Sequence, residues 1–588
     1  PHEQHLLAKP PSMIVLLLHC SAAVVASSPW RARAAPVVHT RDGPIEGKAV
    51  EQSHDLPAPV DSFIGIPFAA APVGDLRWGA PAPHAPWSNI RKATAYGAAC
   101  VQDGGGAAFH EFPLVAMSED CLFLNVYRPH LTTTNASSSM PIMVFFYGGS
   151  YKEGAASFFV YDGSMRVATS VSLRASHGTT PTIIVTVNYR LGIFGYGGHD
   201  ALRDPASHGS TGNWGVLDQR AGLEWVRDNA AALGGDANRV TVFGESAGSG
   251  SVATHIVAPG SNGLFHRAVM ESGPTFSPWI ATTMARASAV FTGVAGRARC
   301  NSTAGGVPNV ACMRALNATY LQTISHDVDQ FLPRSPKTSE LNEPLEYAPT
   351  VDGIVLTALP KALVAAGKLN PSVKGIILGT NQDEGTLFVD KKTVEKMDGN
   401  ASAYLDYVTK QLGENATLGA EAVALYPLLN GFNGSAWEAL SAIEGDAAMS
   451  CPARETARVL SASTSAKVWL YFFTHSFDLA PILGKLIPSI EGIGVAHATE
   501  LIVVFDTRVI TGEFKAERAL ADAVGGYWLR FAASGDPGGA EPDLVAWPEY
   551  KESSDLHLRL DVGANLKVGK GLKKVVCDFW RESATPQQ

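Results

Sequence analysis

The sequence predicts an α/β fold in which helices cover both faces of a mostly parallel central sheet. Two observations predict it. Short runs rich in Val, Ile and Phe are bounded by Gly, Asn or Pro, as expected of buried parallel strands. Between these runs lie segments with apolar residues at three-to-four spacing, as expected of helices. Ligands of such sheets bind beyond the carboxyl ends of the strands, so functional residues should directly follow strands.

The expected elements alternate along the chain. Strands are predicted at 142–147, 182–188, 239–243, 266–270, 375–378 and 468–473. The clearest helical pattern covers 217–229. Two longer tracts, 279–342 and 391–450, carry helical patterns without an obvious central strand. We interpret both tracts as helical cap insertions that roof the site, with a separate domain as the alternative.

Composition indicates a globular protein. The chain has 588 residues, of which 46% are apolar and 17% charged, so it can bury a large core. No Ser/Gly linker, charge block or internal repeat divides it, and we therefore expect one domain over 36–588. The net charge is −9 and no run is rich in Lys or Arg, which argues against nucleic acid as a partner.

The first 35 residues differ from the rest. Met13 begins an apolar run that continues through small residues to Ala26, which is typical of a signal peptide cleaved between Ala26 and Ala35. A buried terminal strand and a membrane anchor are the alternatives, although a span needs about 20 apolar residues. Near the C-terminus the sequence shows no second hydrophobic segment. We therefore expect a secreted protein with neither a transmembrane span nor a lipid anchor.

The even number of cysteines is consistent with disulfide bonds in a secreted protein. After the presumed leader, an even set of six cysteines allows 15 pairings. Spacing favours Cys100 with Cys121 and Cys300 with Cys312, which leaves Cys451 with Cys577. None has the spacing of a zinc site, so no metal is implied. Six N-glycosylation sequons are also present, at Asn135, Asn301, Asn317, Asn400, Asn415 and Asn433.

A G-x-S-x-G pentapeptide centred on Ser246 supplies the candidate nucleophile. By itself this pattern is weak, and a serine that caps a helix is the alternative interpretation. Here it directly follows the predicted strand 239–243 and precedes 249–256, which can begin a helix. That strand-turn-helix setting is typical of a nucleophile elbow, in which glycines leave room for a tight turn that exposes the serine hydroxyl.

Segments throughout the chain carry a family resemblance. They are Gly65-Ile-Pro-Phe-Ala69, Pro72-Val-Gly-Asp-Leu-Arg-Trp78, Glu119-Asp-Cys-Leu-Phe-Leu-Asn-Val-Tyr-Arg-Pro129, Asn188-Tyr-Arg-Leu-Gly192, Gly212-Asn-Trp-Gly-Val-Leu-Asp-Gln-Arg220, Gly234-Gly-Asp236, Phe243-Gly-Glu-Ser-Ala-Gly248 and Cys577-Asp-Phe-Trp580. From about residue 37 to 582 the sequence resembles the type-B carboxylesterases and cholinesterases of the α/β-hydrolase fold. The resemblance implies a serine esterase without a cofactor, and the same disulfide pairing.

A serine hydrolase needs an orienting acid, and in this fold the order is Ser, acid, His. Asp383 and Glu384 both follow the predicted strand 375–378. The resemblance implies Glu384, whereas a loop carboxylate that caps a turn is the commoner role for a residue such as Asp383.

The catalytic base is expected to be a histidine. Of 17 histidines, only His475, His497 and His557 come after Glu384. His497 lies in Gly494-Val-Ala-His-Ala-Thr-Glu500, which is similar to the family's catalytic-histidine loop. We therefore assign His497 as the base. Activity should fall below the pKa of the imidazole, near 6.5 if it is unperturbed.

Main-chain N–H groups must stabilise the oxyanion. Ala247 supplies one, as the residue after the nucleophile. The resemblance places two more at Gly149 and Ser150, in a turn where the family usually has three consecutive glycines. Serine keeps the main-chain donor, but its side chain narrows the site or strains the turn. Glu245 also matches the family and is expected either to act on the site's electrostatics or to have a structural role.

The substrate is expected to be a small carboxylic ester. Cholinesterases hold the choline cation against a Trp in the first disulfide loop, but the loop from Cys100 to Cys121 has only Phe109 and Phe112 as aromatic residues. A generic carboxylesterase fits better than a choline esterase, with a lipase or sterol esterase as the alternative. A more remote alternative is a non-catalytic adhesion protein of the same fold, but such proteins typically lose the nucleophile, and Ser246 is present.

Overall fold

The computed structural model describes residues 34–50, 56–102, 116–131, 139–302, 306–326, 344–477, 492–507, 515–538 and 544–583. The fold below is that of the unit from Pro36 to Gln588. The predicted signal peptide, Phe109, Phe112 and the sequon at Asn135 lie outside the described residues.

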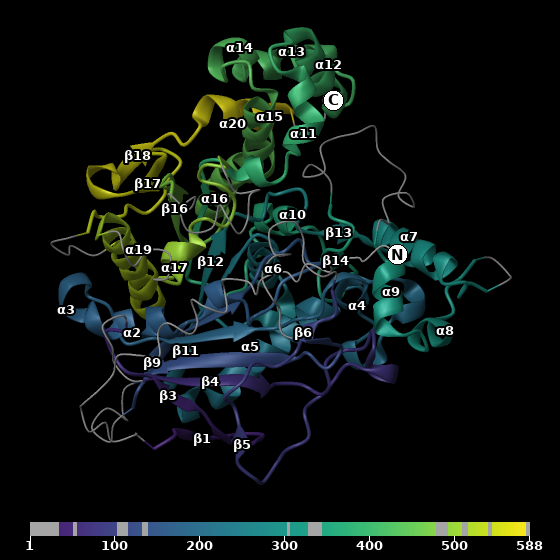
Figure 1. Cartoon of the computed structure of the whole chain (residues 1–588), viewed down its shortest axis with the longest axis vertical. Helices are drawn as coiled ribbons and strands as arrows, with labels where there is room; N and C mark the ends of the chain where they lie inside the picture. Colours follow the sequence, from purple (N-terminus) through teal and green to yellow (C-terminus); the bar gives the residue numbers. More distant parts are fainter. Residues whose placement is uncertain are drawn as a thin grey trace, which may run out of the picture. The chain divides into compact units, whose positions relative to one another are not determined.

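A large mixed sheet forms the centre of this unit (Figure 1). In the described part of the chain, eleven strands pair in the order β18-β17-β16-β15-β12-β11-β9-β10-β8-β4-β3. Neighbours from β17 to β10 are parallel, and the pairs at both edges are antiparallel. The bounds are β3 Lys48–Val50, β4 Val60–Pro67, β8 Phe123–Pro129, β9 Met140–Phe146, β10 Ile183–Val187, β11 Gly235–Glu245, β12 Arg267–Glu271, β15 Gly375–Asn381, β16 Lys467–Phe473, β17 Leu556–Leu560 and β18 Lys567–Lys570.

This sheet confirms the predicted α/β class and all six predicted strands. The antiparallel edge strands were not predicted, because their residues do not form continuous apolar runs. The helical pattern at 217–229 lies within α5 (Trp214–Leu233), which ends at Gly234 in the left-handed conformation, φ 82°. The pattern at 249–256 corresponds to α6 (Ala247–His255).

Further helices flank the sheet and fill the long connections. Their bounds are α2 Ser164–Ser172, α3 Arg174–His177, α4 Gly192–Tyr196, α7 Met284–Arg297, α8 Val310–Arg314, α9 Ala318–Ile324, α10 Pro360–Ala365, α11 Lys391–Val394, α12 Ala401–Gln411, α13 Ala416–Leu425, α14 Leu428–Gly431, α15 Ala436–Gly445, α16 Cys451–Ser463, α17 Leu501–Val504, α19 Lys515–Ser534 and α20 Lys574–Ser583. No helix among the described residues is both long and apolar enough to span a membrane.

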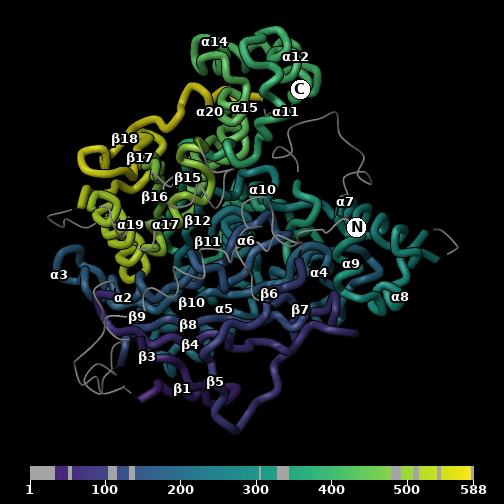
Figure 2. The backbone as a smooth tube through the Cα atoms, in the orientation of Figure 1, coloured from purple at the N-terminus to yellow at the C-terminus, as the bar shows by residue number. Residues whose placement is uncertain are grey.

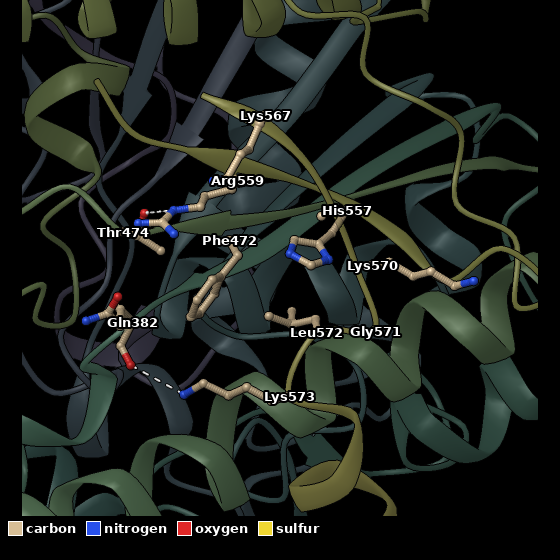
Figure 3. Close-up of a pocket in the computed structure, with 11 residues that line it drawn as sticks. Gln382, Phe472, Thr474, His557, Arg559, Lys567, Lys570, Gly571, Leu572 and Lys573 are labelled. Atoms are coloured by element: carbon tan, nitrogen blue, oxygen red, sulfur yellow. Dashed lines mark hydrogen bonds between the residues drawn. The ribbon is translucent and has the colours of Figure 1, made fainter. Parts of the chain in front are cut away.

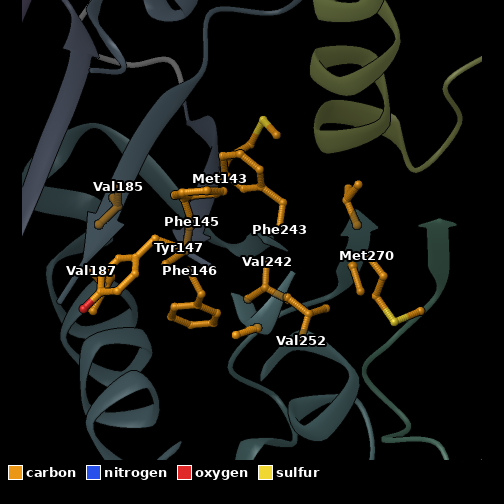
Figure 4. Packing of buried hydrophobic residues seen from close by; sticks show 14 of the residues in the cluster. Met143, Phe145, Phe146, Tyr147, Val185, Val187, Val242, Phe243, Val252 and Met270 are labelled. Carbon is orange, nitrogen blue, oxygen red and sulfur yellow. The ribbon is translucent and has the colours of Figure 1, made fainter. Parts of the chain in front are cut away.

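Side chains that alternate along the central strands build a core on both faces of the sheet (Figure 4). On one face, the rings of Phe145 and Phe243 pack 4.9 Å apart, and both contact Phe505 just after α17. On the other face, Phe146 packs against His255 of α6. This double burial explains why the strands read as continuous apolar runs.

The second helical tract, 391–450, packs around a small core of its own that includes Tyr404 and Trp437. In Figures 1 and 2 its helices α11 to α15 gather beside the C-terminal helix α20. The tract also packs closely against the segment after β15. Gly385 of that segment lies so near the carbonyl oxygen of Ser441 that an added Cβ would be only 2.0 Å from it. The first tract, described in part, contains α7, α8 and α9 with the two-residue strand β13 (Thr282–Thr283).

The disulfide pairing favoured by spacing is confirmed. Bonds join Cys100 to Cys121, Cys300 to Cys312 and Cys451 to Cys577. The last of these ties α16 to α20, across a sequence separation of 126 residues.

Candidate active site

The turn that carries Ser246 connects β11 to α6. Ser246 has φ 56° and ψ −125°, a conformation that costs an L-residue about 1–3 kcal/mol and is found mainly at functional sites. Its backbone N–H donates to the carbonyl of Glu271 on the neighbouring strand β12, at 2.9 Å. Ser246 is half-buried. The turn is therefore strained but firmly anchored.

The two glycines of the pentapeptide are required by close backbone contacts. A Cβ at Gly244 would lie 2.6 Å from the carbonyl group of Gly248. A Cβ at Gly248 would lie only 1.9 Å from the carbonyl oxygen of Phe146. Since any side chain would collide at both positions, helix α6 can start this close to the sheet only with glycine there.

His497 and Glu384 are in direct contact. Nδ1 of His497 lies 2.6 Å from Oε2 of Glu384, and both residues are buried. The other carboxylate oxygen of Glu384 accepts from the hydroxyl of Ser272 at 2.6 Å and from the backbone N–H of Asn381 at 2.7 Å. These bonds fix the carboxylate, which in turn fixes the imidazole with Nδ1 protonated.

Asp383, the alternative acid, has a different partner. Its Oδ2 accepts from the backbone N–H of Val495 at 2.9 Å, and it lies against Gly494, where a Cβ would be 2.5 Å from the same oxygen. Asp383 thus holds the loop that leads to His497. Of the other two late histidines, His475 lies 3.4–3.5 Å from the carboxylates of Asp561 and Glu517, and His557 lies on β17.

The opposite edge of the imidazole faces the serine turn. Nε2 of His497 lies 3.1 Å from Oε1 of Glu245, the residue before Ser246. Both atoms are buried, and neither forms a hydrogen bond of acceptable angle within the described residues. Nε2 is therefore beside the turn and available to a further partner.

Two further carboxyl groups belong to this region: that of Glu500 acts on the imidazole, and that of Glu271 acts on Glu500 and Glu245. Oε1 of Glu500 accepts from Ser272 at 3.4 Å, and its other oxygen accepts from the side chain of Asn381. Glu271 accepts from the indole N–H of Trp528 at 2.8 Å. The one sequence signal for Glu500 was its position three residues after His497, whereas nothing in the sequence pointed to Ser272 or Glu271.

This acidic surrounding shifts the pKa values. Burial lowers the pKa of His497, but the negative charges of Glu245 and Glu384 outweigh burial and raise it to about 9. Burial likewise raises the pKa of Glu245 to about 8 and that of Glu500 to about 7. We expect the neutral imidazole to form at a higher pH than the ordinary value of 6.5.

The turn after β9 lies against the serine. A Cβ at Gly148 would be 2.8 Å from both Cβ of Ser246 and Oε2 of Glu245, so only glycine fits there. The next residues all have positive φ: 107° at Gly149, 54° at Ser150 and 58° at Tyr151. Ser150 therefore occupies a left-handed conformation that costs a side-chain-bearing residue about 1–2 kcal/mol.

Two tyrosines brace the start of this turn. The hydroxyl of Tyr189 donates to the carbonyl of Tyr147 at 2.6 Å, and the hydroxyl of Tyr147 donates to the carbonyl of Tyr189 at 3.2 Å. Their rings stack with centroids 4.5 Å apart. This reciprocal pair fixes the chain just before Gly148.

Apolar side chains lie next to the imidazole. The ring of Phe388 meets that of His497 edge-on, with centroids 5.0 Å apart. Phe388 is 36% exposed and the adjacent Leu387 is 38% exposed, which is high for large apolar residues. They offer an apolar contact surface beside the candidate site.

Two comparisons with known proteins show the family of the chain. The model of the Carboxylesterase family matches residues 34–580. A protein named Cholinesterase from Mus musculus is 31% identical over 572 residues, which cover 93% of this chain and 86% of that protein. The mostly parallel sheet also agrees with the α/β-hydrolase fold that the sequence resemblance implied. The chain belongs to the carboxylesterase family.

Proposed function

We propose that this protein hydrolyses carboxylic esters through an acyl-enzyme intermediate, with Ser246 as nucleophile, His497 as base and Glu384 as orienting acid. The observation that carries the proposal is the position of the imidazole. Nδ1 is hydrogen-bonded to Glu384 at 2.6 Å. Nε2 lies beside the turn of Ser246, 3.1 Å from Oε1 of Glu245. A histidine held by a carboxylate on one nitrogen, with its other nitrogen beside the nucleophile's turn, supports the acid–base–nucleophile order of a catalytic triad.

In the first half of the reaction, Nε2 of His497 takes the hydroxyl proton of Ser246 as the serine oxygen attacks the ester carbonyl carbon. The carbonyl π electrons move onto oxygen, and the main-chain N–H groups of Gly149, Ser150 and Ala247 donate to that oxyanion. When the intermediate collapses, the carbon–oxygen bond to the alcohol breaks. The imidazolium then gives its proton to the leaving alcohol.

In the second half, a water molecule takes the place of the alcohol. His497 removes one proton from the water as it attacks the acyl-serine, and returns that proton to the oxygen of Ser246 when the carboxylic acid leaves. The imidazole carries a positive charge in both transition states. The carboxylates of Glu384 and Glu245 stabilise this charge, which is the same effect that raises the pKa of His497.

The apolar surface of Phe388 and Leu387 supports esters with apolar acyl or aryl groups as substrates. The absence of Trp from the loop between Cys100 and Cys121 argues against choline esters as the main substrates.

We also infer that the protein is secreted. Three disulfides are typical of proteins that fold in an oxidising compartment. The sequon residues Asn317, Asn400, Asn415 and Asn433 are exposed, as acceptors of N-linked glycans must be.

Organophosphate labelling tests the proposed nucleophile. We expect one covalent adduct on the folded protein, located on Ser246 by peptide mass spectrometry, and parallel loss of p-nitrophenyl ester hydrolysis across acyl chains of increasing length. The heat-unfolded protein is the control and should remain unlabelled. Folded protein without an adduct on Ser246 would favour the non-catalytic adhesion alternative.

The pH dependence of hydrolysis should report on Glu245. A protonated imidazole cannot accept the serine proton, so kcat/KM is lost as the pH falls through the pKa of His497. Since the negative charge of Glu245 raises this pKa, Glu245→Gln is expected to move the acid limb of the pH–rate profile to lower pH by about one to three units.

The matched control for that variant is Glu395→Gln, which removes one carboxylate from an exposed position and should leave the limb in place. An acid limb that does not move in Glu245→Gln would refute the electrostatic role of Glu245. A flat profile of the unmodified protein down to about pH 4 would argue against histidine as the base.

A further inference from the structure

A cavity of about 330 Å³ lies at the edge of the sheet formed by β16, β17 and β18 (Figure 3). Its walls include Phe472, His557, Arg559, Lys567 and Lys573. Leu572 adds a further apolar side chain. The cavity therefore combines several cationic groups with an aromatic and an aliphatic surface, and none of its lining residues is acidic.

Strand register explains how these side chains meet. Phe472 of β16 pairs with Arg559 of β17, which pairs in turn with Lys567 of β18. Two residues along the strands, His557 pairs with Gly569, and it therefore lies on the same face as Arg559. Like charges directly opposite one another destabilise a strand pair. The Arg559–Lys567 pair therefore contributes nothing favourable to the fold by itself, but it would stabilise a bound anion.

The cations keep unused donors. Arg559 donates to Thr474 at 2.8 Å and to Asp561 at 2.9 Å, which uses two of its five N–H groups. Lys573 donates to Asp446 at 2.5 Å and to the carbonyl of Gln382 at 3.4 Å, which uses two of three.

Lys567 has no ion-pair partner among the described residues. Lys570 also lines the cavity, but its side chain is directed away from the others in Figure 3.

His557 adds a buried polar group to the same wall. It is 8% exposed, and its Nδ1 has no hydrogen-bond partner within the described residues. Its ring packs so closely on Gly569 that a Cβ there would lie 2.4 Å from Nε2. Burial lowers the pKa of His557 to about 4, so the ring is neutral at pH 7 and can donate one N–H. Buried polar groups of this kind normally have a partner.

We propose that this cavity binds a small organic anion, in which a carboxylate, sulfonate or phosphate group contacts Arg559, Lys567 and His557 while an apolar portion lies against Phe472 and Leu572. The site is distinct from Ser246. Gln382, which lines the cavity, lies two residues before Glu384 in the sequence. The anion site is independent of whether the protein hydrolyses esters.

Isothermal titration calorimetry with benzenesulfonate tests this proposal on the full chain at low ionic strength. We expect one binding site, and affinity at least about tenfold higher than for benzenesulfonamide, which has the same ring without the charge. Lys567→Gln should weaken benzenesulfonate binding about tenfold. Lys368→Gln removes the same charge from an exposed position outside the cavity and is the matched control.

His557→Phe provides a second variant, since phenylalanine keeps the ring but lacks the N–H. It is expected to weaken binding about fivefold. Ser246→Ala should bind benzenesulfonate as the unmodified protein does, which separates this site from the serine. The proposal is overturned if neither Lys567→Gln nor His557→Phe changes the affinity, or if Lys368→Gln weakens binding as much as Lys567→Gln.

Discussion

Ser246→Ala is expected to lower kcat for p-nitrophenyl ester hydrolysis by about 10⁴-fold to 10⁶-fold. The change removes the oxygen that forms the acyl-enzyme, while the donors and the imidazole remain. Folding should be unaffected, because alanine meets the same steric cost as serine at φ 56° and the anchoring backbone bond to Glu271 stays. Steady-state kinetics and circular dichroism on the same preparation measure the two effects.

Ser476→Ala is the matched control, since Ser476 is exposed and lies outside the site. It should retain full activity. If Ser246→Ala kept activity within about tenfold of the unmodified protein, Ser246 would not be the nucleophile, and the remaining hydrolysis would have to come from another residue.

Glu384→Gln is expected to lower kcat by about 10³-fold to 10⁴-fold with little loss of stability. Glutamine can still accept from Ser272 and Asn381 through its carbonyl oxygen. Its amide nitrogen then faces Nδ1 of His497 and donates to it. Nδ1 must therefore lose its proton and Nε2 must carry one, so the imidazole cannot accept the proton of Ser246.

The neighbouring Asp383 provides a close comparison. Asp383→Asn keeps an oxygen that can accept from Val495 N–H, and we expect activity within about tenfold of the unmodified protein. The reverse result, with Asp383→Asn inactive and Glu384→Gln active, would assign the acid to Asp383. Measuring kcat and KM separately distinguishes this catalytic effect from weaker substrate binding.

The sequence predicted the central strands because they are buried on both faces and therefore form continuous apolar runs. The strands of the hairpin β17–β18 were not predicted in this way. In it, charged residues such as Arg559 and Lys567 alternate with apolar ones at the sheet edge. His557 lies on this hairpin, in β17. Edge strands carry a mixed pattern that is harder to recognise than a buried run.

For the candidate site, motifs and positions after strands pointed to Glu384 and His497, which the structure brings into contact, but not to all of their neighbours. The elbow around Ser246 followed from its glycines and its position after a strand. The contact between Glu245 and His497 joins residues 252 positions apart, and no local pattern encodes such a distance. The same holds for Ser272, which donates to Glu384, and for Glu271, which acts on Glu245. Both come near the candidate site because β12, where Glu271 ends the strand, lies beside β11.

The mutual bonds of Tyr147 and Tyr189 bear on how tightly substrates are held. A loop that orders only when an ester arrives consumes part of the ester's contact energy in that ordering, which weakens apparent affinity. Here two hydroxyl–carbonyl hydrogen bonds already fix the chain segment just before the glycine turn. Preference among esters should consequently reflect the shape and polarity of their acyl and alcohol groups, rather than their capacity to organise the protein.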